Sequence, residues 1–183
     1  PARVVERIRT AALLHDVGKV HEEFAPILRK PGKLTDEERR ILETHPVKSA
    51  ELVDKVRMLR SLVPEVRAHH ERWDGRGYPD KLAGANIPVG ARVLTIADTI
   101  DAMMSSRPYR GAMEVADVKR EIERERGSQF DPALVDALLT DVAWARLVRA
   151  IRRSQSLRPG ETLPWEEVEQ PDVTPTISVA AVR

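Results

Sequence analysis

The chain has 183 residues, 42% of them hydrophobic, which suffices for one domain with its own core. Its 30 basic and 29 acidic side chains nearly cancel, so no broad basic face for duplex nucleic acid is expected. The absence of cysteine excludes disulfides and thiolate metal sites and leaves His, Asp and Glu as the available metal ligands. No apolar run approaches the roughly 20 residues of a membrane span, and no charged-then-apolar leader opens the chain. We therefore expect a cytoplasmic protein without a membrane span.

Helical periodicity begins close to the start of the chain. Apolar side chains from Arg3 to Leu14 recur at the spacing of a helix with one buried face. This places His15 and Asp16 near the C-terminal end of the predicted helix. A Lys-Pro-Gly sequence at positions 30–32 is then typical of a turn.

A second helix is predicted from a capping signal. Thr35 and Glu38 have the spacing of a capping box, and the helix that follows should carry Ile41 and Leu42 inward. We expect His45 on this helix or at a break in it, because a proline follows.

The middle of the chain predicts two more helices and a loop. One helix, at 48–59, should bury Ala50, Leu52, Val53 and Val56, and another, at 64–71, should end in the pair His69-His70. Residues 73–90 contain too many glycines and prolines for a regular element, so a structured loop is expected there.

The second half predicts further helices at 91–104, 113–127 and 132–153, the first with Val93, Leu94, Ile96 and Ala97 inside. The domain should therefore be all-α and span residues 1–153. Residues 154–183 are rich in proline and lack apolar periodicity, which predicts an extended C-terminal tail.

Histidines and aspartates occur in a pattern typical of a two-metal hydrolase. Imidazole and carboxylate ligands together suit Fe, Mn, Zn or Ni. Asp16, next to His15, is placed to bridge two ions about 3.5–4 Å apart, a spacing at which a metal-bound hydroxide attacks a phosphodiester. The pattern therefore predicts hydrolysis at phosphorus. The residues that carry it are His15-Asp16, His45-Pro46, His69-His70 and Ala97-Asp98.

The sequence around these groups resembles the HD-GYP family, the bacterial phosphodiesterases that degrade cyclic di-GMP in second-messenger signalling. The resemblance runs from about residue 11 to about residue 139. It rests on the order of the motifs His15-Asp16-Val17-Gly18-Lys19, His45-Pro46, His69-His70-Glu71-Arg72-Trp73-Asp74-Gly75-Arg76-Gly77-Tyr78-Pro79, Ala97-Asp98, Arg107-Pro108-Tyr109-Arg110 and Gly127-Ser128-Gln129-Phe130-Asp131-Pro132.

The resemblance implies a role for each matching residue. An all-α domain of the HD superfamily with a Gly/Pro-rich loop is expected, together with two or three divalent ions, of which Fe or Mn is favoured over Zn or Ni. Lys19 would contact the scissile phosphate, where an ammonium offsets transition-state charge, and Arg107 and Arg110 would bind the ligand. The catalytic residues would be Asp16 and Lys19, and the metal ligands His15, Asp16, His45, His69, His70 and Asp98.

Other residues are assigned weaker roles. Asp101 is expected to orient a ligand or an arginine, Glu71 to support the site, and His21 to lie outside it. The loop Gly75–Pro79, with an exposed Tyr78, is interpreted either as a docking surface for a GGDEF-type partner domain or as a fixed loop that supports the His pair.

The resemblance also indicates what the sequence leaves open. Family members carry further His or Glu ligands on upstream helices, which this chain is expected to lack, and are commonly fused to upstream sensor or receiver domains. The leading hypothesis is hydrolysis of cyclic di-GMP to pGpG and, in some family members, to GMP, by a bridging metal hydroxide. The alternatives are a non-hydrolysing receptor or docking module and a nucleotide phosphohydrolase of the wider superfamily.

Overall fold

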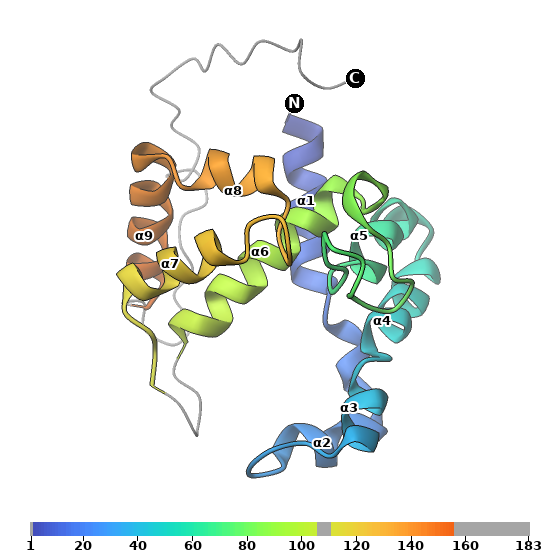
Figure 1. Cartoon of the computed structure of the whole chain (residues 1–183). Coiled ribbons are helices and arrows are strands. Elements are labelled where there is room, and N and C mark those ends of the chain that lie inside the picture. The colour runs from blue at the N-terminus through green and yellow to red at the C-terminus, as the bar shows by residue number, and fades with distance from the viewer. Residues whose placement is uncertain (1, 106–110, 156–183) are drawn as a thin grey trace. The chain divides into compact units, whose positions relative to one another are not determined.

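A computed structural model describes residues 2–105 and 111–155 of the chain, and within them the fold is all-α, as predicted (Figure 1). The only β pairing in these ranges is a single bridge between Arg126 and Phe130. The α-helices are α1 Ala2–Leu14, α2 Ala25–Arg29, α3 Asp36–Leu42, α4 His45–Asp54, α5 Val63–Arg67, α6 Val89–Met104, α7 Val115–Arg124, α8 Pro132–Leu138 and α9 Asp141–Gln155. Short 3-10 segments are η1 Val17–Val20, η2 Glu22–Phe24, η3 Arg57–Leu62 and η4 Gly84–Asn86.

The central core lies where α1, α5 and α6 pack on one another, with α4 against α5 and η1 (Figure 1). Its buried side chains are small or branched aliphatics, which allow the helices to approach closely. They are Ala11, Ala50, Val53, Leu62, Val66 and Leu94. Because α1, α4, α5 and α6 share this core, residues at their ends and inner faces are brought to a common region.

Two local predictions are confirmed by the structure. The first helix occupies Ala2–Leu14, and the capping box is present at the start of α3. There the Thr35 hydroxyl accepts from the Glu38 backbone N–H, and the Glu38 carboxylate accepts from the Thr35 N–H. Two backbone donors at this helix terminus are thereby satisfied.

Several expected inward positions are wrong. Helix α3 has no buried residue, and Ile41 is 36% exposed, because α3 packs only weakly on the η2 segment. The helix expected at 48–59 ends at Asp54, so Val56 is exposed. Ala97 is also exposed, since the buried stripe of α6 runs through Leu94, Ile96 and Ile100.

Helix boundaries also differ from the prediction. Helix α5 ends at Arg67, so His69 and His70 lie in the turn that follows it. The single helix expected at 132–153 is two helices, α8 and α9, separated at residues 139–140. The chain divides there into two compact units, 1–139 and 140–183, and the extent of the predicted domain to residue 153 stays a prediction.

No helix within the described ranges is both long and apolar enough to cross a membrane. Residues 156–183 of the predicted tail lie outside the described residues, so the extended tail stays a prediction.

Candidate metal centre and adjoining pocket

The structure brings the six predicted metal ligands together from four separate segments. His15 and Asp16 follow the end of α1, and His45 is the first residue of α4. The turn after α5 contributes the pair His69-His70, and the middle of α6 contributes Asp98. Within each of two overlapping groups, the ligand atoms lie within 4.8 Å of one another. One group is His45, His69 and His70, and the other is His15, Asp16 and His69.

Three of the imidazoles are oriented by the same local contact. The Nδ1 atoms of His15, His45 and His69 lie 2.7, 2.6 and 2.6 Å from the backbone carbonyl three residues earlier. A carbonyl only accepts hydrogen bonds, so each Nδ1 must carry the proton. In the neutral form of each ring, the Nε2 atom then has a free lone pair, and this is the form that binds a metal.

These Nε2 atoms converge on Asp16. His45 Nε2 lies 3.1 Å from Asp16 Oδ1, His69 Nε2 lies 3.8 Å from the same oxygen, and His15 Nε2 lies 3.4 Å from Oδ2. His45 Nε2 and His69 Nε2 are themselves only 3.2 Å apart. Two lone pairs at this distance repel each other unless a cation or a proton lies between them.

The surroundings of Asp16 fit a cation at this point. Asp16 Oδ1 is buried and accepts no hydrogen bond from any residue the structure describes. Burial is costly for a carboxylate oxygen without a donor or a positive charge. The donor set of neutral imidazole and carboxylate matches Fe, Mn, Zn or Ni. The cluster can therefore hold a metal.

Asp98 and Lys19 complete the arrangement. Asp98 Oδ1 lies 3.9 Å from His15 Nε2, so the α6 carboxylate faces the same center. Lys19, on η1, forms an ion pair of 2.6 Å with Asp16 Oδ2. This ion pair holds the Lys19 ammonium at the cluster, and its contact with a scissile phosphate stays a prediction.

Burial sets the protonation of the cluster. Desolvation lowers the pKa of His69 to about 3 and that of His70 to about 2, so both rings are neutral at physiological pH. Burial raises the pKa of Asp98. Burial also raises the pKa of Asp16, but the ion pair with Lys19 opposes this effect, and the pKa of this carboxyl lies well below its usual range. The cluster therefore contains the neutral imidazoles of His69 and His70 beside the ionised carboxylate of Asp16.

Gly18 allows the His15-Asp16 segment to approach the helix that carries His45. An added Cβ at Gly18 would lie 2.4 Å from Ser49 N and 2.8 Å from His45 O, both of which are backbone atoms. The Gly18 N–H also donates to Ser49 Oγ at 2.8 Å. Only glycine permits this approach, which fixes the distance between the two halves of the cluster.

The Gly-Tyr-Pro loop packs inward against the His pair. The Tyr78 ring stacks on the His70 ring with centroids 4.8 Å apart, and the Tyr78 N–H donates to His70 O at 3.2 Å. An added Cβ at Gly77 would lie 2.4 Å from Arg72 N. The exposed Tyr78 expected from the sequence is therefore wrong, because this side chain is half-buried in the site. The interpretation as a fixed loop that supports the His pair fits these contacts.

Glu71 anchors the second half of the same loop. Its buried carboxylate accepts hydrogen bonds from the backbone N–H groups of Asp80 at 2.7 Å and Leu82 at 3.0 Å. Burial raises the pKa of Glu71. Glu71 therefore supports the site by fixing the backbone of this loop through two hydrogen bonds.

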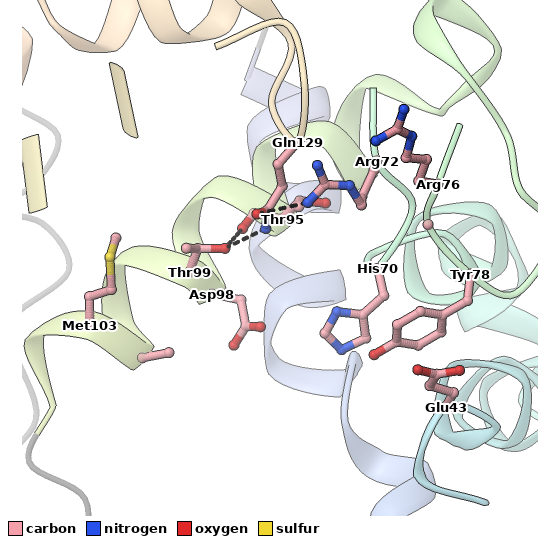
Figure 2. Close-up of a pocket in the computed structure, with 12 residues that line it drawn as sticks. Glu43, His70, Arg72, Arg76, Tyr78, Thr95, Asp98, Thr99, Met103 and Gln129 are labelled. Carbon is pink, nitrogen blue, oxygen red and sulfur yellow. Dashed lines mark hydrogen bonds between the residues drawn. The ribbon is translucent and has the colours of Figure 1, made fainter. Parts of the chain in front are cut away.

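A pocket of about 670 Å³ adjoins the cluster on the side of His70 and Asp98 (Figure 2). Its volume is in the range of small-molecule sites. The polar groups around it come from α3, the Gly-Tyr-Pro loop, α6 and the loop before α8. They include Glu43, Arg72, Arg76, Tyr78, Thr99 and Gln129.

The comparisons with known proteins place this geometry in a family. The family model described as HD domain matches residues 1–134. The chain belongs to the HD domain family. The recognition of its HD-GYP branch from the sequence motifs is confirmed by relatives named as cyclic di-GMP phosphodiesterases.

Three relatives and a solved structure show how far the likeness extends. The chain is 39% identical over 158 residues to the cyclic di-GMP phosphodiesterase response regulator RpfG of Xanthomonas campestris, covering 85% of the chain and 42% of the relative. It is 38% identical over 151 residues to 3'3'-cGAMP-specific phosphodiesterase 2 of Vibrio cholerae, covering 81% and 28%. It is 37% identical over 180 residues to cyclic di-GMP phosphodiesterase PA4108 of Pseudomonas aeruginosa, covering 98% and 42%.

The crystal structure of the V. cholerae cyclic GMP-AMP phosphodiesterase V-cGAP3 aligns with a TM-score of 0.54 at 20% identity, covering 84% of this chain and 43% of that one. This likeness shows the shared fold. The chain spans less than half the length of each of these four proteins.

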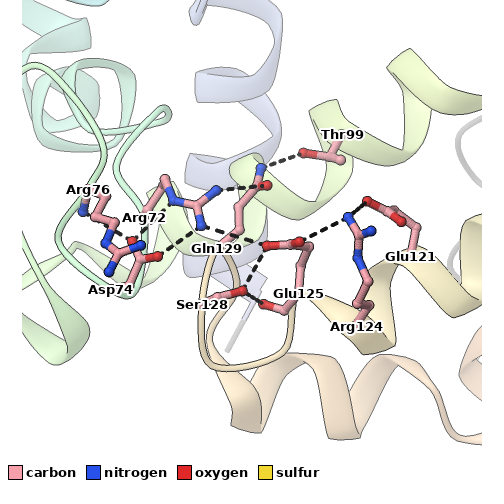
Figure 3. Close-up of polar contacts among 9 residues, drawn as sticks. All are labelled: Arg72, Asp74, Arg76, Thr99, Glu121, Arg124, Glu125, Ser128 and Gln129. Carbon is pink, nitrogen blue, oxygen red and sulfur yellow. Dashed lines mark hydrogen bonds and ion pairs between the residues drawn. The ribbon is translucent and has the colours of Figure 1, made fainter.

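One wall of the pocket of this HD domain is held by a polar network that the motifs did not predict (Figure 3). The Arg72 guanidinium donates to both oxygens of Asp74 at 3.1 and 2.9 Å and to Gln129 Oε1 at 3.2 Å. Gln129 in turn donates to Thr99 Oγ1 at 3.3 Å, next to Asp98 on α6. The network ties the Gly-Tyr-Pro loop and the loop before α8 to the helix that carries Asp98.

The sequence contained a partial signal for this network. Arg72 and Gln129 both lie within motifs of the family resemblance, but nothing in their spacing shows that they meet across 57 positions. Glu43 gave no signal, since an acidic residue near a helix end is usually solvated.

Of the remaining predicted residues, two are not described by the structure, and one lies beside the cluster without the expected contact. Arg107 and Arg110 lie outside the described residues. Asp101 is exposed and lines a separate small pocket with His15 and Asp98. No contact between its carboxylate and a ligand residue or an arginine is found in the described part of the chain.

Proposed function

We propose that this HD domain is a metal-dependent phosphodiesterase that hydrolyses cyclic di-GMP to pGpG. The observation that carries the proposal is the convergence of three imidazole lone pairs on Asp16, with His45 Nε2 and His69 Nε2 3.2 Å apart beside a nucleotide-sized pocket. The relatives named as cyclic-dinucleotide phosphodiesterases support the substrate class.

The chain would hold divalent ions through the six clustered ligands, with Asp16 in a position to contact more than one of them. Such ions, when bound, supply Lewis acidity and lower the pKa of water to roughly 7. The number of ions, two or three, and the preference for Fe or Mn over Zn or Ni are part of the proposal.

Lys19 and the pocket arginines would position the phosphodiester. Lys19 is held at the cluster by its 2.6 Å ion pair with Asp16, where its ammonium would face a non-bridging phosphate oxygen. Arg76 is exposed at the pocket and has no ion pair among the described residues, so its guanidinium is available to an anion. Arg107 and Arg110 are proposed to add to this cationic surface.

Tyr78 and the loop around it would keep the pair His69-His70 in place during turnover. The ring stacks on His70 and covers one side of the imidazole, which restricts the access of water to that ligand. The docking of a GGDEF-type partner through Gly75–Pro79, and the control by an upstream sensor or receiver domain, stay predictions.

The proposal is tested by turnover of cyclic di-GMP, with the protein loaded anaerobically with Fe(II) or Mn(II) and the products resolved by chromatography. We expect pGpG, with or without further conversion to GMP. Replacement of His15 and Asp16 by alanine should abolish both turnover and metal uptake, whereas His21→Ala, which changes a histidine outside the cluster, should retain both. No product from fully loaded wild-type protein would refute the enzyme and favour a cyclic-dinucleotide receptor.

A further inference from the structure

Glu43 places a carboxylate in a pocket that is proposed to bind a phosphodiester. It is the C-cap residue of α3 and lines the same pocket as His70 and Asp98. Figure 2 shows its carboxylate near the Tyr78 ring. Burial raises the pKa of Tyr78, and the negative charge of Glu43 adds to the effect, which agrees with their proximity.

The fold gives no structural reason for this carboxylate. Among the described residues, none donates a hydrogen bond to Glu43 or forms an ion pair with its side chain. Its place at the C-terminal end of α3 is also unfavourable, because the partial negative charge of a helix C-terminus repels an anion. Glu38 on the same helix differs, since it forms the capping box and an ion pair with Lys30.

The carboxylate is also unsuited to the phosphates of the proposed substrate. Anionic oxygens would be repelled by Glu43, so a nucleotide can contact it favourably only through hydrogen-bond donors. The donors of a cyclic dinucleotide are the ribose 2′-hydroxyls and the N–H groups of the bases. Guanine presents two adjacent donors, N1–H and N2–H₂, which match the two oxygens of one carboxylate. Adenine presents N6–H₂ beside the acceptor N1, which a carboxylate repels.

We infer that Glu43 binds the Watson–Crick edge of one guanine and thereby selects guanine over adenine at that end of the substrate. The inference rests on the proposed phosphodiesterase function and adds a specificity-determining residue to it. Arg76 lines the same pocket, and its guanidinium is suited to donate hydrogen bonds to phosphate oxygens. The pocket thus offers an acceptor for a base and a donor for a phosphate.

Glu43→Gln tests the inference by changing hydrogen-bonding pattern with little change of shape. A glutamine side chain offers one acceptor and one donor, which suits adenine and leaves one guanine donor facing an N–H group. We would measure kcat and KM for cyclic di-GMP, 3'3'-cGAMP and cyclic di-AMP with metal-loaded wild type and variant. Glu37→Gln is the matched control, because Glu37 is exposed on α3 and does not line the pocket.

We expect the ratio of kcat/KM for cyclic di-GMP to that for cyclic di-AMP to fall about 10- to 100-fold in Glu43→Gln, the range of one bidentate base contact. The change should lie mainly in KM, and Glu37→Gln should keep the wild-type ratio. An unchanged ratio would overturn the inference. An equal loss of kcat/KM on all three substrates would also overturn it, because it would mean that Glu43 contacts the ribose or the metal centre and not a base. Wild-type turnover of the base-free diester bis(p-nitrophenyl) phosphate tests the phosphodiesterase separately, so its failure is distinguished from that of the Glu43 assignment.

Discussion

Substitution of Gly18 by alanine should separate the two halves of the metal centre. The new Cβ would lie 2.4 Å from Ser49 N and 2.8 Å from His45 O, about 1 Å closer than ordinary contact at the first of these. Both atoms belong to the backbone of α4, so no side-chain rotation relieves the clash. The η1 segment must then move away from α4, taking the neighbouring His15 and Asp16 with it.

The magnitude follows from two costs. Overpacking of a tight site destabilises by about 1–3 kcal/mol, and loss of the 2.8 Å bond from Gly18 N–H to Ser49 Oγ adds about 1 kcal/mol. We therefore expect Gly18→Ala to lower the free energy of unfolding of the metal-free protein by about 2–4 kcal/mol. Because the ligand segments move apart, metal affinity should also fall by about 10- to 100-fold, the range seen when ligand orientation is disturbed.

Urea denaturation of chelator-treated protein and titration with Mn(II) measure the two effects. Gly111→Ala is the control, since none of the residues that the structure describes has an atom within 4 Å of an added Cβ there. Wild-type stability and metal affinity in Gly18→Ala would refute the reasoning, because they would mean that η1 and α4 do not set the ligand spacing.

Three further outcomes follow from the same structure. The native pKa values of His69 and His70, about 3 and about 2, lie below the unfolded value of about 6.5, so the unfolded chain binds more protons as the pH falls toward 5.5. Chelator-treated protein should therefore lose about 3 kcal/mol of unfolding free energy between pH 7.5 and 5.5, measured by urea denaturation. A stability that does not change with pH would contradict this. Glu71→Gln should lower the free energy of unfolding by about 2–3 kcal/mol and speed amide exchange in the Gly-Tyr-Pro loop, because one buried backbone N–H loses its acceptor. Amides that stay protected from exchange would contradict the role of Glu71 in fixing the loop. Arg76→Ala should raise KM for cyclic di-GMP about tenfold and make KM less dependent on salt. Arg126→Ala is the control, because the Arg126 guanidinium is paired with Asp136. An unchanged KM in Arg76→Ala would mean that Arg76 does not bind the substrate.

The sequence predicted the structure best where local helix signals or chemically distinctive residues were present. The capping box at Thr35 and the helix at residues 2–14 are local features that depend on neighbouring residues alone, and both were predicted correctly. The candidate ligands were recognised because several His and Asp residues recur in a known order. Their convergence around Asp16 needed the structure, since it depends on the packing of α1, α4, α5 and α6.

The predictions that proved wrong depend on tertiary packing. Periodicity alone placed Ile41 and Ala97 inside, but a residue is buried only if another element covers it, and no described element covers either side chain. An exposed Tyr78 was expected with the interpretation of the loop as a docking surface. Its inward position is imposed by the close contact at Gly77 and by the stacking on His70.

Local hydrogen bonds and packing hold the imidazoles of the cluster in a form that binds metal. Three Nδ1–H groups are bound to carbonyls of the preceding turn, so rotation of the rings to relieve the contact between Nε2 atoms would break these bonds. His69 is fully buried and neutral, and Thr95 Oγ1 also donates to its carbonyl at 2.8 Å, which anchors the turn to α6. Since these contacts orient the ligands, little ordering entropy opposes the binding of a cation, and a cation between the Nε2 atoms would remove the contact between their lone pairs. The contacts that orient the imidazoles therefore also favour a bound cation.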